Sequence, residues 1–250
     1  MLRNELQSVE QTLGRISKCD SAETSAENLT LVASLGDPGS TLGFIDSLLA
    51  DPTALRAIAG RSYRHANHFD KIVLVDSADP SAYRLTLHMW NPPYSDAELR
   101  DELIHDHRFS FWSCVLAGEL VSENFDNSDG GSRFRAYQYV PEDSSSTSFY
   151  RFAGERTLSP TSLSRNIAGE SYHLRYDRIH RVRLPQANLV CTLVLRGPRE
   201  RTFSNVFNTV YPRADALIKH DLFTERAVAT RLMTLADACR ARLSGEKAAR

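Results

Sequence analysis

Two histidines, His105 and His107, are separated by one residue in the stretch ELIHDHRFSFWSCVLAGEL. In a β-strand, residues i and i+2 point to the same face, so a strand here would project both imidazoles to one side. Imidazole nitrogens are common metal ligands, and the pair would supply two of them. The alternative is two structural or surface histidines at the end of a strand. The pair therefore indicates a metal site only if further ligands accompany it.

The frame around the pair resembles the first motif of the cupin superfamily, in which His-x-His is followed by a glutamate and then by a glycine where the strand turns. Gly118 lies at the expected interval, but Phe111 stands at the glutamate place. Neither Phe111 nor its neighbour Trp112 can bind a metal, and Leu99 replaces the leading glycine of the motif. The resemblance therefore implies a metal site without the carboxylate ligand.

The second cupin motif supplies a third histidine from another strand, after a glycine and a turn. In GESYHLRYDRIH the matching residues are Gly169 and His180, with residues 175–177 in place of the usual Pro-x-Gly turn. Asp177 suits this turn, because Asp tolerates backbone conformations for which glycine is otherwise used. His173 is the competing candidate, but it lies inside the strand and not after the turn. The resemblance implies three metal ligands: His105, His107 and His180.

Three histidines without a carboxylate narrow the resemblance to one branch of the cupins. The order of YRLTLHMWNPP, IHDHRFSFWSCVLAGEL, AGESYHLRYDRIHRV and LVLRGP resembles the cysteine dioxygenase branch over about residues 61–200. The resemblance implies Fe(II) held by neutral imidazoles, with open positions for a small, anionic substrate and O₂. It thus implies an iron-dependent oxygenase. The alternatives are a non-redox metal cupin, acting as an isomerase or hydrolase, and a metal-free ligand-binding cupin.

Two features of that branch are missing from this chain. Trp112 stands about where its members carry a cysteine that is crosslinked to a tyrosine. Cys191, Leu193 and Leu195 stand where a Ser-His-Tyr trio is expected. In the family these groups orient the substrate and O₂, whereas the histidines bind the metal. We therefore expect an iron site but a substrate larger or flatter than free cysteine, held against aromatic walls formed by Phe111 and Trp112.

A polar strand face offers further candidates for substrate binding. In YRLTLHMW, Arg84, Thr86 and His88 alternate with apolar residues. Turned outward, this face would be a solvated surface. Turned into a barrel, it would make Arg84 a two-pronged carboxylate clamp and His88 a catalytic group beside the metal. The sequence leaves both interpretations open.

Other candidates lie in a loop and on the late strand. RSYRHANHFDK places Arg61 and Arg64 near the position of the family's carboxylate-binding arginine, and exposed loop arginines are the alternative. Tyr172 and Tyr176 are candidate proton donors in catalysis, with packed core aromatics as the alternative.

The elements that must position these residues form three zones. Residues 1–60 are predicted to be helical, because LRNELQSVEQTLGRI has one apolar face and DPTALRAIAG begins with the N-cap Asp51 and ends at Gly60. Residues 61–211 show period-two strands separated by turn clusters. Residues 212–250 are helical again and end in a charged tail. We predict a mostly β, cupin-type antiparallel barrel or sandwich with helices at both ends, forming one compact domain.

Composition excludes several classes of protein. Lys and Arg total 30 against 31 Asp and Glu, so no net field attracts nucleic acid or an anionic membrane. No apolar run is long enough to span a bilayer, and residues 1–30 lack a signal core, which favours a cytoplasmic protein. The four cysteines are widely spaced, as reduced thiols would be. We expect a small-molecule substrate and O₂ as partners, and a homodimer stays an open option.

Overall fold

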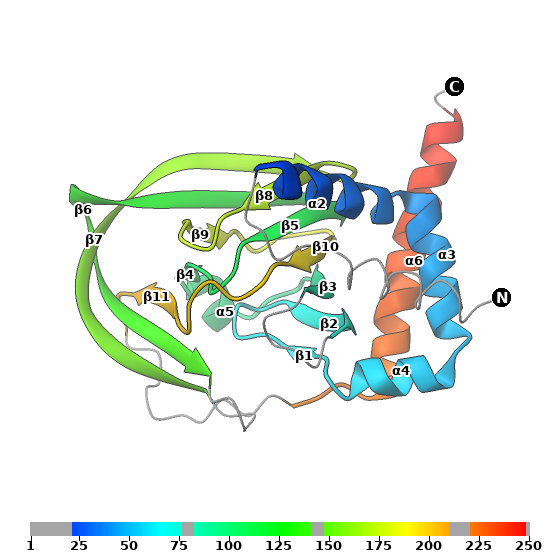
Figure 1. Ribbon diagram of the computed structural model, residues 1–250, viewed down its shortest axis with the longest axis horizontal. Helices are drawn as coiled ribbons and strands as arrows, with labels where there is room; N and C mark the ends of the chain where they lie inside the picture. Colours follow the sequence, from blue (N-terminus) through cyan, green and yellow to red (C-terminus); the bar gives the residue numbers. More distant parts are fainter. Residues whose placement is uncertain (1–21, 77–82, 142–147, 211–220, 249–250) are drawn as a thin grey trace.

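The structure is a computed structural model that describes residues 22–76, 83–141, 148–210 and 221–248. The helix expected over residues 2–16 lies outside these ranges, as do residues 212–220 of the predicted C-terminal helical zone. Within them, strands that pair only in antiparallel fashion make two sheets (Figure 1). The predicted β architecture with helices at both ends is confirmed.

One sheet contains six described strands and the other contains five. The six-stranded sheet has the order β1 (Tyr63–Arg64), β2 (Asp70–Val75), β3 (Arg84–Trp90), β10 (Val190–Arg196), β5 (Phe111–Ala117) and β8 (Ser171–Leu174). The five-stranded sheet has the order β11 (Ser204–Asn208), β4 (Ile104–His105), β9 (Ile179–Val182), β6 (Glu119–Pro141) and β7 (Ser148–Ile167). The long strands β6 and β7 form a curved hairpin at the end of the molecule opposite the helices (Figure 1).

The sequence suggested that the stretch containing the histidine pair is one strand, and this expectation is wrong. It divides into β4, β5 and β6, and these strands belong alternately to the two sheets. Gly118 makes the second crossing with a φ of +75°, and a Cβ there would lie 2.4 Å from the carbonyl oxygen of Leu189. Because only glycine accepts both conditions, the chain can turn from one sheet to the other at this point.

Helices cover the outer face of the six-stranded sheet. They are α2 (Ala22–Leu35), α3 (Pro38–Leu49), α4 (Pro52–Ala59) and α6 (Glu225–Ala248). Asp51 caps α4 by accepting hydrogen bonds from the amides of Thr53 and Ala54, and Gly60 is its C-cap, as predicted. The apolar side chains Ile45, Leu48, Val228, Leu232 and Leu235 from these helices are fully buried against the sheet.

A further short helix, α5 (Asp96–Arg100), interrupts the β region between β3 and β4. Ser95 and Glu98 form a reciprocal capping box at its start, in which each side chain accepts from the other's backbone amide. No helix among the described residues is long and apolar enough to cross a membrane.

Candidate functional site

The two sheets enclose a cavity of about 170 Å³. This is smaller than the roughly 300–1,000 Å³ typical of sites for drug-sized ligands, so it suits a small molecule. Side chains from both sheets line it, and they include the three candidate histidines, four basic residues and four tyrosines: His105, His107, His180, Lys71, Arg84, Arg108, Arg196, Tyr63, Tyr139, Tyr150 and Tyr172.

His105, His107 and His180 converge at this cavity. One nitrogen from each side chain lies within 4.8 Å of the others, and the Nε2 atoms of His107 and His180 are 2.9 Å apart. Metal–imidazole bonds are about 2.0–2.1 Å long, so two ligands at right angles on one ion would have nitrogens about 3 Å apart. The spacing of the imidazoles therefore fits a single metal ion.

The backbone brings the histidines together in a different way from the one expected. His105 is on β4 and is the register partner of His180 on β9, so these two imidazoles come from paired strands. His107 lies in the loop after β4, where its amide donates to the carbonyl of Tyr176. The i, i+2 relation in a single strand is thus replaced by a strand pair and an anchored loop.

Hydrogen bonds orient two of the rings with Nε2 toward the common centre. Nδ1 of His105 lies 2.8 Å from the carbonyl oxygen of Leu103 and donates to it. Leu103 itself has a φ of 55°, a strained conformation for a leucine, which turns this carbonyl toward the ring. Nδ1 of His180 lies 3.2 Å from Oγ of Ser122. Such partners fix the tautomer of a ligating histidine, so that the lone pair for a metal is on Nε2.

Burial keeps the three imidazoles neutral. It lowers the pKa of His105, and it holds the pKa values of His107 and His180 well below the ordinary value. The positive charges that neighbouring histidines would carry act in the same direction on His107 and His180. Neutral imidazoles offer lone pairs, so the donor set suits a divalent transition metal.

No carboxylate or thiolate joins the three histidines in the part of the chain that the structure describes. Asp106 lies between His105 and His107 in the sequence. Its carboxylate accepts hydrogen bonds from the backbone and side-chain amides of Asn205, both at 2.6 Å. It also forms an ion pair with Arg201. Asp106 therefore fixes the loop and does not take the place of the missing glutamate.

His173 is not part of this centre. It is an exposed residue on β8, and its ring stacks on Trp112 at 5.1 Å between centroids, on the face of the sheet away from the cavity. His180 is the third histidine of the cluster, in agreement with the choice made from the sequence.

The polar face of β3 points into the barrel. Arg84 and His88 line the cavity together with Thr86, whereas Leu85, Leu87 and Met89 pack under the helices. The helical layer explains this orientation, because it buries the apolar face that would otherwise meet solvent. His88 is neutral, since burial holds its pKa well below the ordinary value. Arg84 is engaged by Asp76 through two hydrogen bonds of 2.7 and 2.9 Å.

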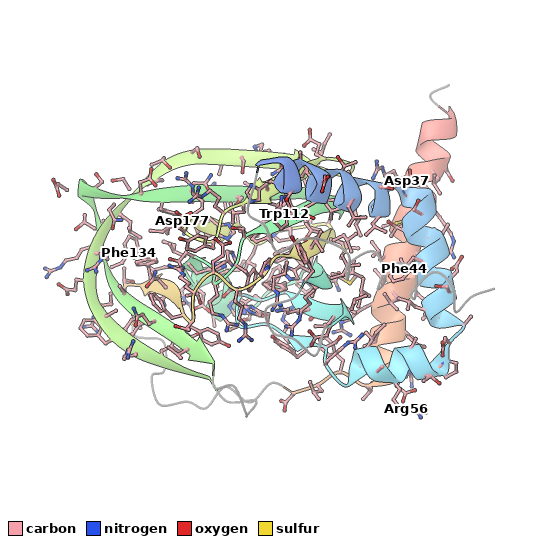
Figure 2. The ribbon with its side chains drawn as sticks, in the orientation of Figure 1. Asp37, Phe44, Arg56, Trp112, Phe134 and Asp177 are labelled. Atoms are coloured by element: carbon pink, nitrogen blue, oxygen red, sulfur yellow. The ribbon has the colours of Figure 1, made fainter. Side chains whose placement is uncertain are left out.

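Phe111 and Trp112 fall on opposite faces of β5. Phe111 lines the cavity edge-on to His107, with ring centroids 5.1 Å apart, as a wall residue should. Trp112 instead lies under α2, where its Nε1 donates to Ser25 at 2.9 Å (Figure 2). The expectation that Trp112 contacts the substrate is therefore wrong, because adjacent strand residues point to opposite faces.

The same alternation corrects the reading of β10. Leu193 and Leu195, expected beside the metal, belong to the core between the sheet and the helices. The β10 residues that line the cavity are Thr192, Val194 and Arg196.

Of the two candidate tyrosines, the structure places one in the cavity. Tyr172 lines it near Phe111, and burial raises its pKa to about 12, so its phenol stays protonated. Tyr176 is not among the described residues that line the cavity, and the guanidinium of Arg201 lies over its ring. A role for Tyr176 in catalysis is not supported by this position.

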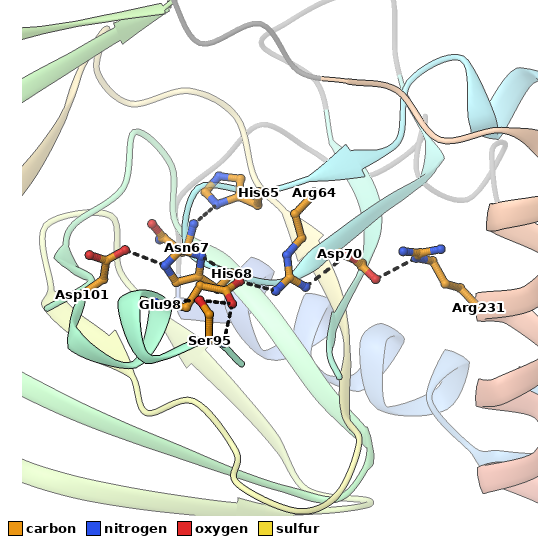
Figure 3. A network of polar contacts seen from close by, with 9 residues as sticks. All are labelled: Arg64, His65, Asn67, His68, Asp70, Ser95, Glu98, Asp101 and Arg231. Atoms are coloured by element: carbon orange, nitrogen blue, oxygen red, sulfur yellow. Dashed lines mark hydrogen bonds and ion pairs between the residues drawn. The ribbon is translucent and has the colours of Figure 1, made fainter. Parts of the chain in front are cut away.

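Arg61 and Arg64 both lie outside the cavity lining. Arg61 donates to the carbonyls of Val73 and Leu74, at 2.8 and 2.5 Å, and so ties the loop to β2. Arg64 is held between the carboxylates of Asp70 and Glu98, as Figure 3 shows. Neither arginine is placed to clamp a substrate carboxylate.

The network around Arg64 supports the loop that closes one side of the site. Asp70 also binds Arg231 of α6, and Glu98 is joined to His68, which binds Asp101 (Figure 3). Asn67 of this loop places its side-chain nitrogen 3.3 Å from Nε2 of His105. The network therefore connects Arg231 of α6 with His68, which is the chain neighbour of Asn67.

Three basic cavity residues were missed by sequence reasoning: Lys71 on β2, Arg108 in the loop after β4, and Arg196 at the end of β10. The alternation of CTLVLRG contained a signal for Arg196, which shares a face with Thr192 and Val194. Nothing in the local pattern around Lys71 or Arg108 separates them from ordinary surface residues.

Comparisons with known proteins give only distant structural similarities. No family model and no curated protein matches the chain. Among solved structures, the chain is similar to the DMSP lyase DddQ from Ruegeria pomeroyi DSS-3, with 13% identity, a TM-score of 0.34, and coverage of 63% of this chain and 60% of that one. A structure of the DMSP lyases RdDddP and RnDddQII matches with 14% identity, a TM-score of 0.38, and coverage of 80% and 93%.

A mutant of the oxalate decarboxylase OxdC of Bacillus subtilis matches with 12% identity, a TM-score of 0.35, and coverage of 60% of this chain. The chain spans only 30% of that protein's length. At these scores the comparisons carry no argument about activity. The fold class rests on the chain's own strands, which form two antiparallel sheets with helices at both ends.

Proposed function

We propose that the protein is an Fe(II)-dependent oxygenase that acts with O₂ on a small, anionic substrate, as the resemblance of its motifs to the cysteine dioxygenase branch implies. The convergence of His105, His107 and His180 on one point of the cavity carries the proposal. Ferrous iron held there would supply the one-electron chemistry that dioxygen needs.

The charge of such a site favours an anion. Three neutral ligands leave the 2+ charge of the ion uncompensated, because no carboxylate of the described chain belongs to the cluster. Four basic residues line the same cavity: Lys71, Arg84, Arg108 and Arg196. A substrate that carries negative charge would be attracted both by the metal ion and by these basic residues.

The surrounding side chains have separate tasks in this proposal. Phe111 forms an apolar wall beside His107 and excludes water there. Tyr172 holds a proton that it can donate in a hydrogen bond to a bound anion. Burial keeps His88 neutral, so its imidazole, whose Nε2 lies 3.2 Å from Oγ1 of Thr86, can form a hydrogen bond with the substrate without adding charge.

The experiment is to load the metal-free protein with Fe(II) without air and to measure iron per chain. O₂ consumption is then followed with pooled small-molecule metabolites. Bound iron and substrate-dependent O₂ uptake, both lost in His180→Ala, would support the proposal. Bound metal without O₂ uptake would favour a non-redox isomerase or hydrolase. A protein that binds no divalent metal would favour a metal-free ligand-binding module, and the proposal would be abandoned.

A further inference from the structure

A second cavity lies between the six-stranded sheet and the helices that cover it. Its volume is about 500 Å³, which is within the roughly 300–1,000 Å³ typical of small-molecule sites. Side chains of β2, β3, β5 and β10 form one wall. Side chains of α3 and α6, which pack side by side, form the opposite wall (Figure 1). We call this space the apolar cavity.

The apolar cavity and the histidine cavity lie on opposite faces of the same strands. Leu85 and Leu87 of β3 line the apolar cavity, whereas Thr86 and His88, which alternate with them, line the histidine cavity. Adjacent strand residues point to opposite faces, so one layer of sheet separates the two spaces. Their described lining residues do not overlap. The apolar cavity is therefore a separate site.

The walls of the apolar cavity are suited to an uncharged molecule. None of its described lining residues is charged, and Ser40 and Thr41 are the only ones among them with a polar side chain. The hydroxyl of Thr41 already donates to the carbonyl of Leu35 at 2.9 Å. A buried water needs about two to four polar partners, so water would be held poorly here.

An empty apolar cavity of this size would be costly. Protein interiors are packed as densely as organic crystals, and unfilled apolar volume lowers stability in proportion to its size. At about 500 Å³ the loss would be comparable with the entire stability of an ordinary domain. An occupant is therefore expected, and the walls require it to be apolar.

The entrance to the apolar cavity lies where α2 is followed by α3. Leu35, Ser40 and Phe44 are partly or fully exposed, whereas the other described lining residues are buried. The carboxylate of Asp37 accepts from the amide of Ser40 at 3.0 Å and places a negative charge at this entrance. This charge would repel an anionic head group, which favours a neutral ligand.

We propose that the apolar cavity binds a neutral, apolar small molecule, such as an aliphatic alcohol. Its hydrocarbon chain would lie between the leucines of the sheet and those of α6, and its hydroxyl could bond to that of Ser40 at the entrance. This site goes beyond the proposed oxygenase function, and it requires no metal.

The test uses the full chain after treatment with a chelator. Binding of the neutral fluorescent dye N-phenylnaphthylamine is measured, and decanol and decanoate compete with it at neutral pH. Leu87→Phe and Leu235→Phe each add a ring, one from the sheet and one from α6, and so reduce the free volume. Leu158→Phe is the matched control, because Leu158 is equally buried in a different core cluster and lines neither cavity.

Decanol should displace the dye at least about tenfold more effectively than decanoate, because a buried carboxylate would find no cation in the described lining. Each cavity variant should weaken dye binding by about tenfold or more and keep its melting temperature, because the ring enters unfilled space. Leu158→Phe should bind the dye as the wild type does, but its melting temperature should fall, because overpacking strains a filled core.

Absence of dye binding, equal competition by decanol and decanoate, or equal dye binding by the wild type and both cavity variants would overturn the proposal. So would melting temperatures of both cavity variants that fall as far as that of Leu158→Phe, because other residues of the chain would then already fill the space. Iron loading is measured separately, so failure of this proposal would leave the oxygenase proposal standing, and the reverse also holds.

Discussion

His105 and His180 are register partners on β4 and β9, and their ring centroids lie 4.8 Å apart. Strand pairing therefore sets the spacing of two candidate ligands, whereas His107 is held by the loop that follows β4. A site built in this way depends on the pairing of these strands as much as on the histidines themselves.

Replacing His180 with alanine should remove most of the bound metal, because the two histidines that remain would bind a divalent ion only weakly. His173→Ala is the matched control, since it deletes an exposed imidazole on the other face of the sheet. Metal per folded chain is measured by elemental analysis after dialysis. Loss of metal from His173→Ala with retention in His180→Ala would contradict the assignment.

Ser122→Ala should weaken metal binding by about 10–100-fold, as the loss of a partner that orients a ligating histidine usually does. The Ser122 hydroxyl lies 3.2 Å from Nδ1 of His180 and donates to the carbonyl of Arg181 at 3.3 Å. Ser162→Ala, at an exposed position on β7, is the control. The affinity is measured by competition with a chromophoric chelator, and equal affinities in the two variants would refute the orienting role.

Leu232→Ala in α6 should lower the free energy of unfolding by about 2–5 kcal/mol, because Leu232 is fully buried against the sheet and a cavity would remain. Metal per folded chain should not change, since α6 contributes no ligand to the described cluster. Chemical denaturation and elemental analysis test the two statements. A fall in metal content in the folded variant would mean that the helical layer takes part in the site.

The iron-loaded protein should oxidise free cysteine poorly. At the inner positions of β10 stand Thr192, Val194 and Arg196, and Phe111 fills the space beside His107. Sulfinate formation and O₂ uptake are measured under air with cysteine as the substrate. Turnover near the median enzyme rate of roughly 10 s⁻¹ would show that this cavity accepts a small thiol after all.

The sequence could predict the β architecture from its strand periodicity, and the histidine cluster from the resemblance of its motifs to those of cupins. Gly118 stands where the chain changes sheet, as the glycine of the first motif implies. The break between β4 and β5 could not be predicted, since both segments are apolar and each joins a different sheet.

The roles of the basic residues could not be predicted for a related reason. A charged residue in an amphipathic strand normally faces water, and Arg84 reverses this rule only because helices cover the other face. Lys71 enters the cavity through its register with His88, which is a long-range property. Packing against the helices, and not the sequence of the strand alone, decides which face of the strand points into the cavity.

Strand β10 alternates between two neighbourhoods, residue by residue. Cys191, Leu193 and Leu195 meet the helices, whereas Thr192 and Arg196 meet the cavity. Adjacent residues of this strand therefore serve different purposes: one face stabilises the fold and the other contacts the ligand. Substitutions at every second residue can change ligand preference while the interface with the helices stays the same. A mutant library restricted to the cavity positions would therefore explore new specificities on an unchanged fold.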